Sequence, residues 1–269
     1  MILVNGVESC VPGDDRGLLL GDGLFETIMM EAGQPRLWRY HVARLERGLK
    51  RLGFPPADEA LLREELQQVA PEGRCVARIT ITRGQGPRGY APPDAIAMTR
   101  IVSGGALLTP STGSDPVPLR MGWSRVAMAI QPALAGLKHT SRLEQVVIRQ
   151  GWESGWDEAV VCDTQGRLVS ATQGNLWWRQ GLDLFTPPVD QAGIAGTRRA
   201  WVFDHAAACG LAVHEQSAEP QALGQVDGLY VSNARLGLYP ARLIETDTPS
   251  TAWQDDPVRV LSMALHEAD

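Results

Sequence analysis

The sequence lacks the features of several large protein classes. Its four cysteines are far apart and show no Cys-x-x-Cys or Cys/His spacing, which argues against a zinc site and a disulfide framework. No apolar run approaches the length of a membrane span, and no basic region followed by a long apolar stretch opens the sequence. The net charge of -6 argues against a surface for nucleic acid or anionic membranes. We therefore expect a soluble, cytoplasmic protein that binds no metal, nucleic acid or membrane.

Lysine is also scarce, since the 25 basic residues include only two lysines, Lys50 and Lys138. Lys50 lies in a highly charged stretch, where a solvated helix face accounts for it. Lys138 follows the apolar run 133–137, where an ammonium is costly unless its pKa shifts or a partner neutralises it. An amine that loses its proton is a nucleophile, and arginine cannot replace it. Lys138 is thus a candidate Schiff-base lysine; the alternative is a lysine that covers apolar surface and reaches water with its amine.

The spacing of apolar and turn residues predicts a mixed α and β chain of two unequal lobes. The stretch 104–118, rich in Gly, Ser, Thr and Pro, is the best linker candidate. Ser141 and Glu144 have the spacing of a capping box, which predicts a helix from about residue 141. The other predicted elements are strands near 2–4, 24–30, 74–82, 95–103, 119–124, 159–162, 176–178 and 229–232, and helices near 39–52, 58–69, 197–209 and at the C-terminus.

Two glycine-rich segments are candidate ligand loops. Residues 84–89 read Gly-Gln-Gly-Pro-Arg-Gly, but the prolines that follow Tyr90 prevent a prompt helix, so the context excludes a dinucleotide loop. The segment could bind a carboxylate through its arginines, or be a plain glycine-rich hairpin. Residues 191–199 place two glycines before an apolar helix, whose first amides suit a phosphate. Arg44 is a second candidate phosphate ligand; an ordinary helix start and a surface arginine are the alternatives.

A buried lysine and a phosphate cradle together suggest pyridoxal phosphate as a cofactor. Several short motifs support this interpretation, and they occur in order between about residues 3 and 242. They are Gly-Asp-Gly-Leu-Phe-Glu-Thr at 21–27, His-Val-Ala-Arg-Leu at 41–45, Arg-Gly-Gln-Gly-Pro-Arg-Gly-Tyr at 83–90, Leu-Ala-Gly-Leu-Lys-His at 134–139, Arg-Leu-Glu-Gln-Val at 142–146, Asn-Leu at 175–176, Gly-Thr-Arg-Arg at 196–199, and Ser-Asn at 232–233 with Pro240. This ordered set resembles the 4-amino-4-deoxychorismate lyases, members of the fold-type IV (branched-chain aminotransferase-like) family.

The resemblance implies an α+β fold of the fold-type IV kind in two domains. Residues 1–110 would form a small N-terminal α/β domain, and residues 111–269 a larger C-terminal domain with a β-barrel-like sheet and the cofactor lysine. It also implies a homodimer with pyridoxal phosphate at the domain interface, held covalently by Lys138. The implied cofactor contacts are Arg44, Ser170, Thr197, Arg198 and Asn233. We expect the substrate contacts to be Arg83, Arg88, Tyr90 and Thr27.

One departure from the family pattern affects the chemistry of the cofactor. Where the family usually has a glutamate that faces the pyridine nitrogen, this chain has Ser170. A carboxylate keeps that nitrogen protonated, whereas a hydroxyl leaves it largely neutral, which disfavours transamination more than elimination. The resemblance therefore implies a lyase that converts 4-amino-4-deoxychorismate to p-aminobenzoate and pyruvate in folate synthesis. The alternatives are a D-amino-acid or branched-chain aminotransferase, and a catalytically weakened relative that binds the cofactor.

Overall fold

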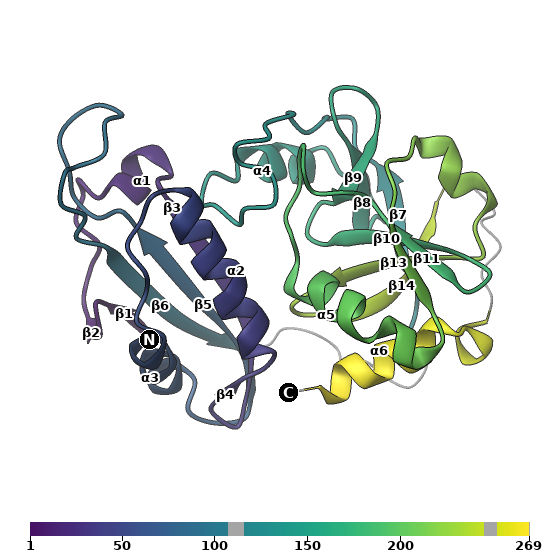
Figure 1. Cartoon of the computed structure of the whole chain (residues 1–269), viewed down its shortest axis with the longest axis horizontal. Helices are drawn as coiled ribbons and strands as arrows, with labels where there is room; N and C mark the ends of the chain where they lie inside the picture. The colour runs from purple at the N-terminus through teal and green to yellow at the C-terminus, as the bar shows by residue number, and fades with distance from the viewer. Residues whose placement is uncertain (107–115, 245–251, 269) are drawn as a thin grey trace. The chain divides into compact units, whose positions relative to one another are not determined.

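The computed structural model describes residues 1–106, 116–244 and 252–268, which form two compact units (Figure 1). The first unit contains the elements before residue 107 together with Leu137–Arg142, and the second contains the remaining described residues. The segment with Lys138 was expected in the C-terminal domain, but it clusters with the first unit because its backbone pairs with a strand there. Most of the predicted linker 104–118 lies outside the described residues, and residues 104–106 continue a strand.

The first unit is built on a six-stranded antiparallel sheet. The long central strands pair in a register that sets Phe25 opposite Thr80 and Thr27 opposite Arg78. Because side chains alternate along a strand, these four residues share one face of the sheet. The strand order is β2 (Val7–Glu8), β1 (Ile2–Val4), β6 (Thr99–Ala106), β5 (Arg74–Thr82), β3 (Gly23–Glu31) and β4 (Gln34–Pro35).

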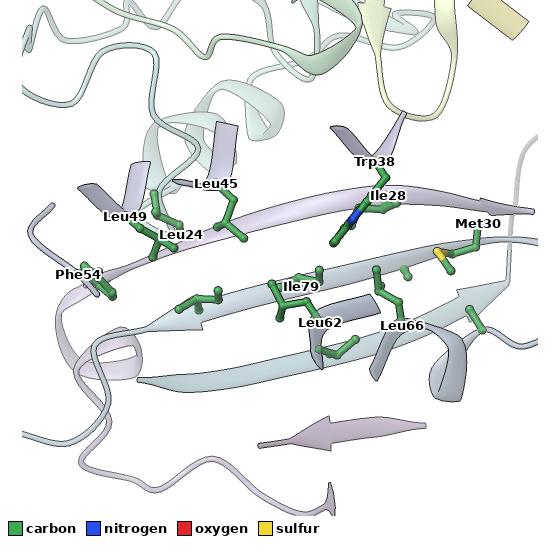
Figure 2. Packing of buried hydrophobic residues seen from close by; sticks show 14 of the residues in the cluster. Leu24, Ile28, Met30, Trp38, Leu45, Leu49, Phe54, Leu62, Leu66 and Ile79 are labelled. Atoms are coloured by element: carbon green, nitrogen blue, oxygen red, sulfur yellow. The ribbon is translucent and has the colours of Figure 1, made fainter. Parts of the chain in front are cut away.

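Two helices cover the opposite face of this sheet, as Figures 1 and 2 show. They are α2 (Trp38–Arg51) and α3 (Glu59–Val69), which confirm the two predicted helices. Leu45 of α2 and Leu62 of α3 recur at helical spacing with other leucines and pack on Ile28 and Ile79 of the sheet. Gly53, which follows α2, takes a left-handed conformation (φ 69°) and so ends that helix. The core of this unit therefore lies on one side of the sheet.

The second unit is built on an eight-stranded mixed sheet. Its last strand, β9, approaches β10, so that the sheet curls on itself as the expected barrel-like sheet does. Val160, Leu176 and Val231 fill the concave core. The strand order is β12 (Ala212–Glu215), β11 (Asp183–Thr186), β10 (Asn175–Gln180), β13 (Gly228–Asn233), β14 (Gly237–Leu243), β7 (Leu119–Trp123), β8 (Glu158–Cys162) and β9 (Leu168–Ala171).

The helices of the second unit follow the prediction except at one start. The predicted capping box is wrong: α4 (Leu143–Gln150) begins at Leu143, and Ser141 Oγ donates to the carbonyl of Gly21 (3.4 Å). Glu144 instead accepts a hydrogen bond from the amide of Ala129 (2.7 Å), because tertiary partners outcompete the local cap. The other helices are α5 (Thr197–His205), α6 (Val258–Glu267) and the short 3₁₀ turns η1 (Ala206–Cys209), η2 (Pro220–Gln225) and η3 (Trp253–Asp255).

Candidate active site

The segment 137–140 extends the sheet of the first unit beside β3. The amide of Phe25 donates a hydrogen bond to the carbonyl of Lys138 (2.9 Å), and the amide of Thr140 donates to that of Gly23 (2.9 Å). The Leu137 side chain is buried in the core of this unit. The backbone on both sides of Lys138 is therefore held by the fold, so its side chain projects from a rigid element.

The amine of Lys138 lies over the ring of Phe25, with Nζ 4.2 Å from the ring centre. Burial, followed by the positive charge of Arg44, lowers the pKa of this ammonium from 10.5 to about 7, while the charge of Glu26 opposes the shift. A large share of the amine is therefore unprotonated near neutral pH, as a nucleophile requires. Lys138 is only half-buried by its accessible surface, and a role as the Schiff-base lysine stays a prediction.

Arg44 belongs to a buried cluster with Glu26 and His41. Glu26 Oε1 accepts a hydrogen bond from Arg44 Nε (2.7 Å), Oε2 is bonded to Arg44 Nη2, and His41 Nδ1 lies 2.6 Å from Oε2. Although burial alone would raise it, the Arg44 charge and the hydrogen bonds from Arg44 and His41 lower the pKa of Glu26 to about 2. Glu26 is thus an anion that fixes one edge of the Arg44 guanidinium.

The face of the sheet opposite the helices carries polar groups together with Phe25, which the Lys138 amine contacts. The guanidinium of Arg78 stacks on the Phe25 ring, 3.8 Å from its centre, and its charge contributes to the low pKa of Lys138. Thr27 is directly opposite Arg78 in the sheet, and no hydrogen bond within the described ranges reaches its hydroxyl. Arg78 is not among the site residues predicted from the sequence, although an arginine that alternates with buried residues along a strand is a readable signal.

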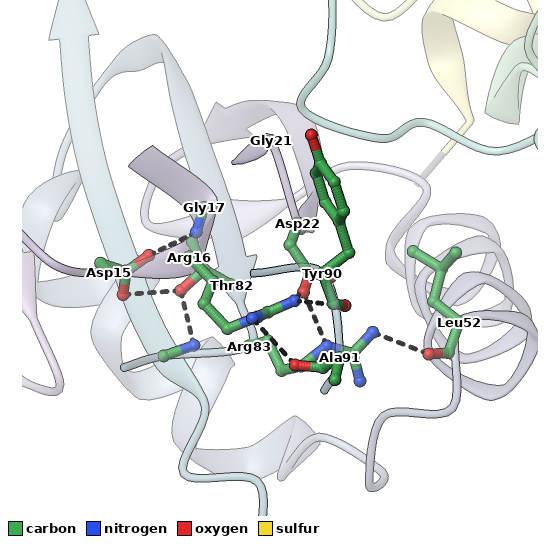
Figure 3. A network of polar contacts seen from close by, with 12 residues as sticks. Asp15, Arg16, Gly17, Gly21, Asp22, Leu52, Thr82, Arg83, Tyr90 and Ala91 are labelled. Carbon is green, nitrogen blue, oxygen red and sulfur yellow. Dashed lines mark hydrogen bonds and ion pairs between the residues drawn. The ribbon is translucent and has the colours of Figure 1, made fainter. Parts of the chain in front are cut away.

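The predicted substrate contacts of the glycine-rich loop differ in their surroundings (Figure 3). Arg83 is buried and donates through Nε to Asp22 (2.8 Å) and through Nη2 to the carbonyl of Leu52 (2.9 Å). Arg88 and Tyr90 are exposed, and Tyr90 is 88% accessible. Two nitrogens of Arg83 are therefore used in hydrogen bonds within the unit. The side chains of Arg88 and Tyr90, in contrast, are accessible to a ligand. A substrate role for each stays a prediction.

Ser170 lies in β9 of the second unit and is largely buried. It lies opposite Val161 of β8, and only 6% of its surface is exposed. Within the described part of the chain, its hydroxyl has no hydrogen-bond partner. A hydroxyl that the fold leaves without a hydrogen bond is available to a polar ligand atom.

The first turn of α5 has the features of an anion site. Gly196 precedes the helix without a side-chain cap, and in the described residues nothing hydrogen-bonds to the amide of Thr197. A methyl group at Gly196 would overlap Oδ1 of Asn175, whose Nδ2 donates to the carbonyl of Ile194 (2.9 Å). The Arg198 side chain is buried, and its Nη1 donates to Thr197 Oγ1 (3.2 Å). The positive end of the helix is therefore open to a phosphate.

Asn233, the last predicted cofactor contact, ends β13. Its Oδ1 accepts hydrogen bonds from the amides of Arg235 (3.0 Å) and Leu236 (2.8 Å), so it shapes the turn that leads to β14. Its cofactor role stays a prediction. No group of three metal-ligating side chains occurs in the described ranges, and none of the helices there is long and apolar enough to span a membrane.

Residues 23–244 match the family model described as amino-transferase class IV, which covers most of the chain. The chain belongs to this family. The prediction of pyridoxal phosphate is confirmed at the level of the family, whose members depend on this cofactor.

Relatives with known names include both lyases and aminotransferases. The aminodeoxychorismate lyase of Vibrio harveyi is 30% identical over 243 residues, which cover 89% of this chain and 90% of the relative. A putative branched-chain-amino-acid aminotransferase of Methanocaldococcus jannaschii is 28% identical over 235 residues, or 84% and 80% of the two chains. The crystal structure of 4-amino-4-deoxychorismate lyase from Pseudomonas aeruginosa matches with a TM-score of 0.89 and 34% identity, and the match covers 99% of this chain and 97% of that one. The fold-type IV architecture is thereby confirmed.

Proposed function

We propose that this chain is a pyridoxal phosphate-dependent lyase that converts 4-amino-4-deoxychorismate to p-aminobenzoate and pyruvate. The observation that carries the proposal is the Lys138 amine, with a pKa of about 7, which contacts the same Phe25 ring as the Arg78 cation. A nucleophilic amine that shares an aromatic ring with a cation suits an anionic substrate. Similarity to the Vibrio harveyi and Pseudomonas aeruginosa lyases supports the same reaction. We infer that it serves folate synthesis in the cytoplasm.

The residues of the chain would fit the cofactor in two chemical respects. Lys138 would hold the aldehyde carbon as a Schiff base, and its low pKa favours that bond. Arg44 and the amides of Thr197 and Arg198 would hold the phosphate, with Asn233 nearby. The cofactor supplies an electron sink for charge that develops next to the substrate nitrogen.

Lys138 and Thr27 are the proposed proton carriers. The Lys138 amine, once released from the cofactor, takes the proton from the substrate carbon that bears the amino group. The electron pair of that C–H bond is then available to expel the enolpyruvyl oxygen, and the departing enolate becomes pyruvate when its methylene carbon takes up a proton from the Lys138 ammonium or from water. The ring becomes aromatic, which supplies much of the driving force. The Thr27 hydroxyl is available to relay a proton, since no hydrogen bond from the described residues engages it.

Cations on and near the loop would bind the carboxylates of the substrate. Arg88 and Tyr90 are exposed, Arg83 lies at the base of the loop, and Arg78 stacks on the Phe25 ring that the Lys138 amine also contacts. Arg78 pairs with no carboxylate among the described residues, so its charge is available for one of the substrate.

Ser170 favours a lyase over an aminotransferase. Its hydroxyl would face the pyridine nitrogen, where it accepts or donates one hydrogen bond but cannot hold a proton on the ring as a carboxylate does. An elimination that expels its leaving group soon after proton removal needs the protonated ring less than a transamination does.

The first alternative is an aminotransferase, which the Methanocaldococcus jannaschii relative favours. Turnover that depends on an α-keto acid, with no p-aminobenzoate formed, would support it. The second alternative is a weakened relative that binds the cofactor. It predicts normal cofactor absorption with no pyruvate release.

We also propose that the chain forms a homodimer. Two short helices expose apolar side chains that a soluble monomer seldom displays in groups. Leu18 and Leu19 of α1 (Arg16–Leu20) are 66% and 62% exposed, and Leu143 at the start of α4 is 77% exposed, with Val146 and Val147 about half exposed on the same helix. Sedimentation equilibrium tests the proposal: a dimer mass supports it, and a monomer at micromolar concentration overturns it.

The direct test is incubation of the purified protein with 4-amino-4-deoxychorismate, followed by detection of p-aminobenzoate and pyruvate. Lys138→Ala is the control, because it removes the nucleophile. Equal amounts of both products from the wild type, with none from the variant, would support the lyase. Products at the same rate from both proteins would contradict it.

A further inference from the structure

A buried arginine in the first unit donates hydrogen bonds to three consecutive carbonyls of the glycine-rich loop, residues 84–91. Arg16, the first residue of α1, donates through Nη1 to Gly89 and Ala91 and through Nη2 to Tyr90, each at 3.1 Å. Only 4% of Arg16 is exposed. These hydrogen bonds join parts of the chain more than 70 residues apart, and Figure 3 shows the Tyr90 ring extending away from the Arg16 guanidinium.

A shared carboxylate fixes the other edge of the Arg16 guanidinium. Asp22 Oδ2 accepts hydrogen bonds from Arg16 Nε (2.9 Å) and Arg83 Nε (2.8 Å). Although burial opposes it, the hydrogen bonds and charges of Arg83 and Arg16 lower the pKa of Asp22, which therefore stays an anion. Arg83 in turn bonds to the carbonyl of Leu52 at the end of α2. The loop is thus tied through one carboxylate to the rigid part of the unit.

The backbone of Arg16 is held as firmly as its side chain. Its amide donates to the carbonyl of Gly84 (2.9 Å), at the base of the loop. Asp15 caps α1 by accepting from the amide of Gly17 (2.8 Å) and also accepts from Thr82 Oγ1 (2.8 Å). A Cβ at Gly86 would lie 2.9 Å from Arg16 Cδ, so the loop requires glycine there to pack against the arginine.

We propose that Arg16 is a positioning residue that holds the loop 88–91 in the shape in which Arg88 and Tyr90 meet the carboxylates of the substrate. This rests on the proposed function, in which those two side chains bind substrate. Arg16 is turned inward and bonded to the fold, so it acts through the loop. A lysine cannot replace it, because one ammonium cannot present the planar set of donors that reaches three carbonyls and a carboxylate.

Arg16→Lys tests the proposal, with Arg100→Lys as the matched control. Arg100 also forms a forked pair with a buried carboxylate in this unit, that of Glu65, but it does not touch the loop. The first readout is trypsin cleavage after Arg88, identified by mass spectrometry of the fragments. Cleavage requires the loop to open, so Arg16→Lys should accelerate it by on the order of tenfold, whereas Arg100→Lys should not.

The second readout is kinetic. A loosened loop weakens binding of the substrate in its ground and transition states alike, so KM should rise on the order of tenfold while kcat stays within about twofold. The absorption of the bound cofactor should not change. Asp22→Asn, which keeps the shape but removes the shared charge, should shift both readouts in the same direction and serves if Arg16→Lys does not fold.

The outcomes separate this inference from the proposed function. Faster cleavage together with a higher KM supports the inference. Unchanged cleavage after Arg88, or unchanged KM with the loop opened, overturns it. If the wild type forms no p-aminobenzoate, the proposed function fails, and an aminotransferase assay with the same variants supplies KM. Because cleavage does not require turnover, it still decides whether Arg16 holds the loop.

Discussion

The Nζ atom of Lys138 lies 4.2 Å from the centre of the Phe25 ring, against a backbone that is hydrogen-bonded to the same phenylalanine. The aromatic face attracts an ammonium only weakly and does not replace the hydration that the ammonium has in water. The charged form of the amine is therefore less stable here than in water. This pairing explains how an amine can be both held in place and ready to lose its proton.

The first prediction concerns the pH dependence of stability in the cofactor-free protein. The pKa of Lys138 is lowered from 10.5 to about 7 on folding, so the buried charge costs stability in full below about pH 7. Between pH 7 and 10.5 the unfolded chain binds the extra proton, and the cost falls as pH rises. Lys138→Met should therefore raise Tm most below pH 7 and progressively less toward pH 10.5, as measured by calorimetry.

Lys50→Met is the control for that experiment. Lys50 is exposed in the last turn of α2, so its removal should change Tm little at any pH. A gain from Lys138→Met that does not vary with pH would contradict the assigned pKa shift.

The second prediction concerns Glu26. Glu26→Gln removes the anion from a buried cluster and leaves the Arg44 charge without its main partner, so unfolding should become easier by about 3 kcal/mol. Urea denaturation measures this change. Glu153→Gln breaks an exposed pair with Arg125 and should cost less than about 1 kcal/mol. Equal costs for the two variants would show that the cluster does not hold Arg44.

The third prediction concerns Ser170. Ser170→Glu would supply a carboxylate to the pyridine nitrogen, keep it protonated, and so favour transamination. The conversion of the bound cofactor to its amine form by an amino donor, followed by absorbance, should accelerate by about tenfold or more. Ser170→Ala, which offers no charge, should not accelerate it. If Ser170→Glu behaves like the alanine variant, Ser170 does not face the ring nitrogen.

The fourth prediction concerns the start of α5. The Cβ added by Gly196→Ala would overlap Asn175 and force a movement there. This movement should displace the backbone amides at the start of α5, so phosphate binding should weaken. The free energy of unfolding should fall by about 1 to 3 kcal/mol. Equilibrium dialysis of free pyridoxal phosphate measures the affinity. Gly224→Ala is the control, because nothing lies within 4 Å of the added atom. Similar affinities of the two variants would argue against a phosphate at this helix end.

Local patterns in the sequence predicted most of the elements and the candidate lysine. The helices over 39–52 and 58–69 match α2 and α3 within one residue at each end, since apolar spacing and chain breakers are local signals. Lys138 stood out because arginine carries almost every other basic position.

Contacts between distant residues could not be predicted in the same way. Glu26 and His41 are 15 residues apart, and Arg16 and Tyr90 are 74 apart, so only the folded sheet brings them together. The capping box at Ser141 failed for the same reason: Gly21 and Ala129 offered its two residues partners from other segments. Arg78 was missed because its meaning depends on which face of β5 meets Lys138.

The most direct test of this account is borohydride reduction of the purified protein with its cofactor, followed by digestion and peptide mapping. The chain has only two lysines, and Lys50 is exposed in α2, so the assignment is unambiguous. We expect a single pyridoxyl label on Lys138. A label on Lys50, or no label on either lysine, would contradict the assignment of Lys138 as the residue that holds the cofactor.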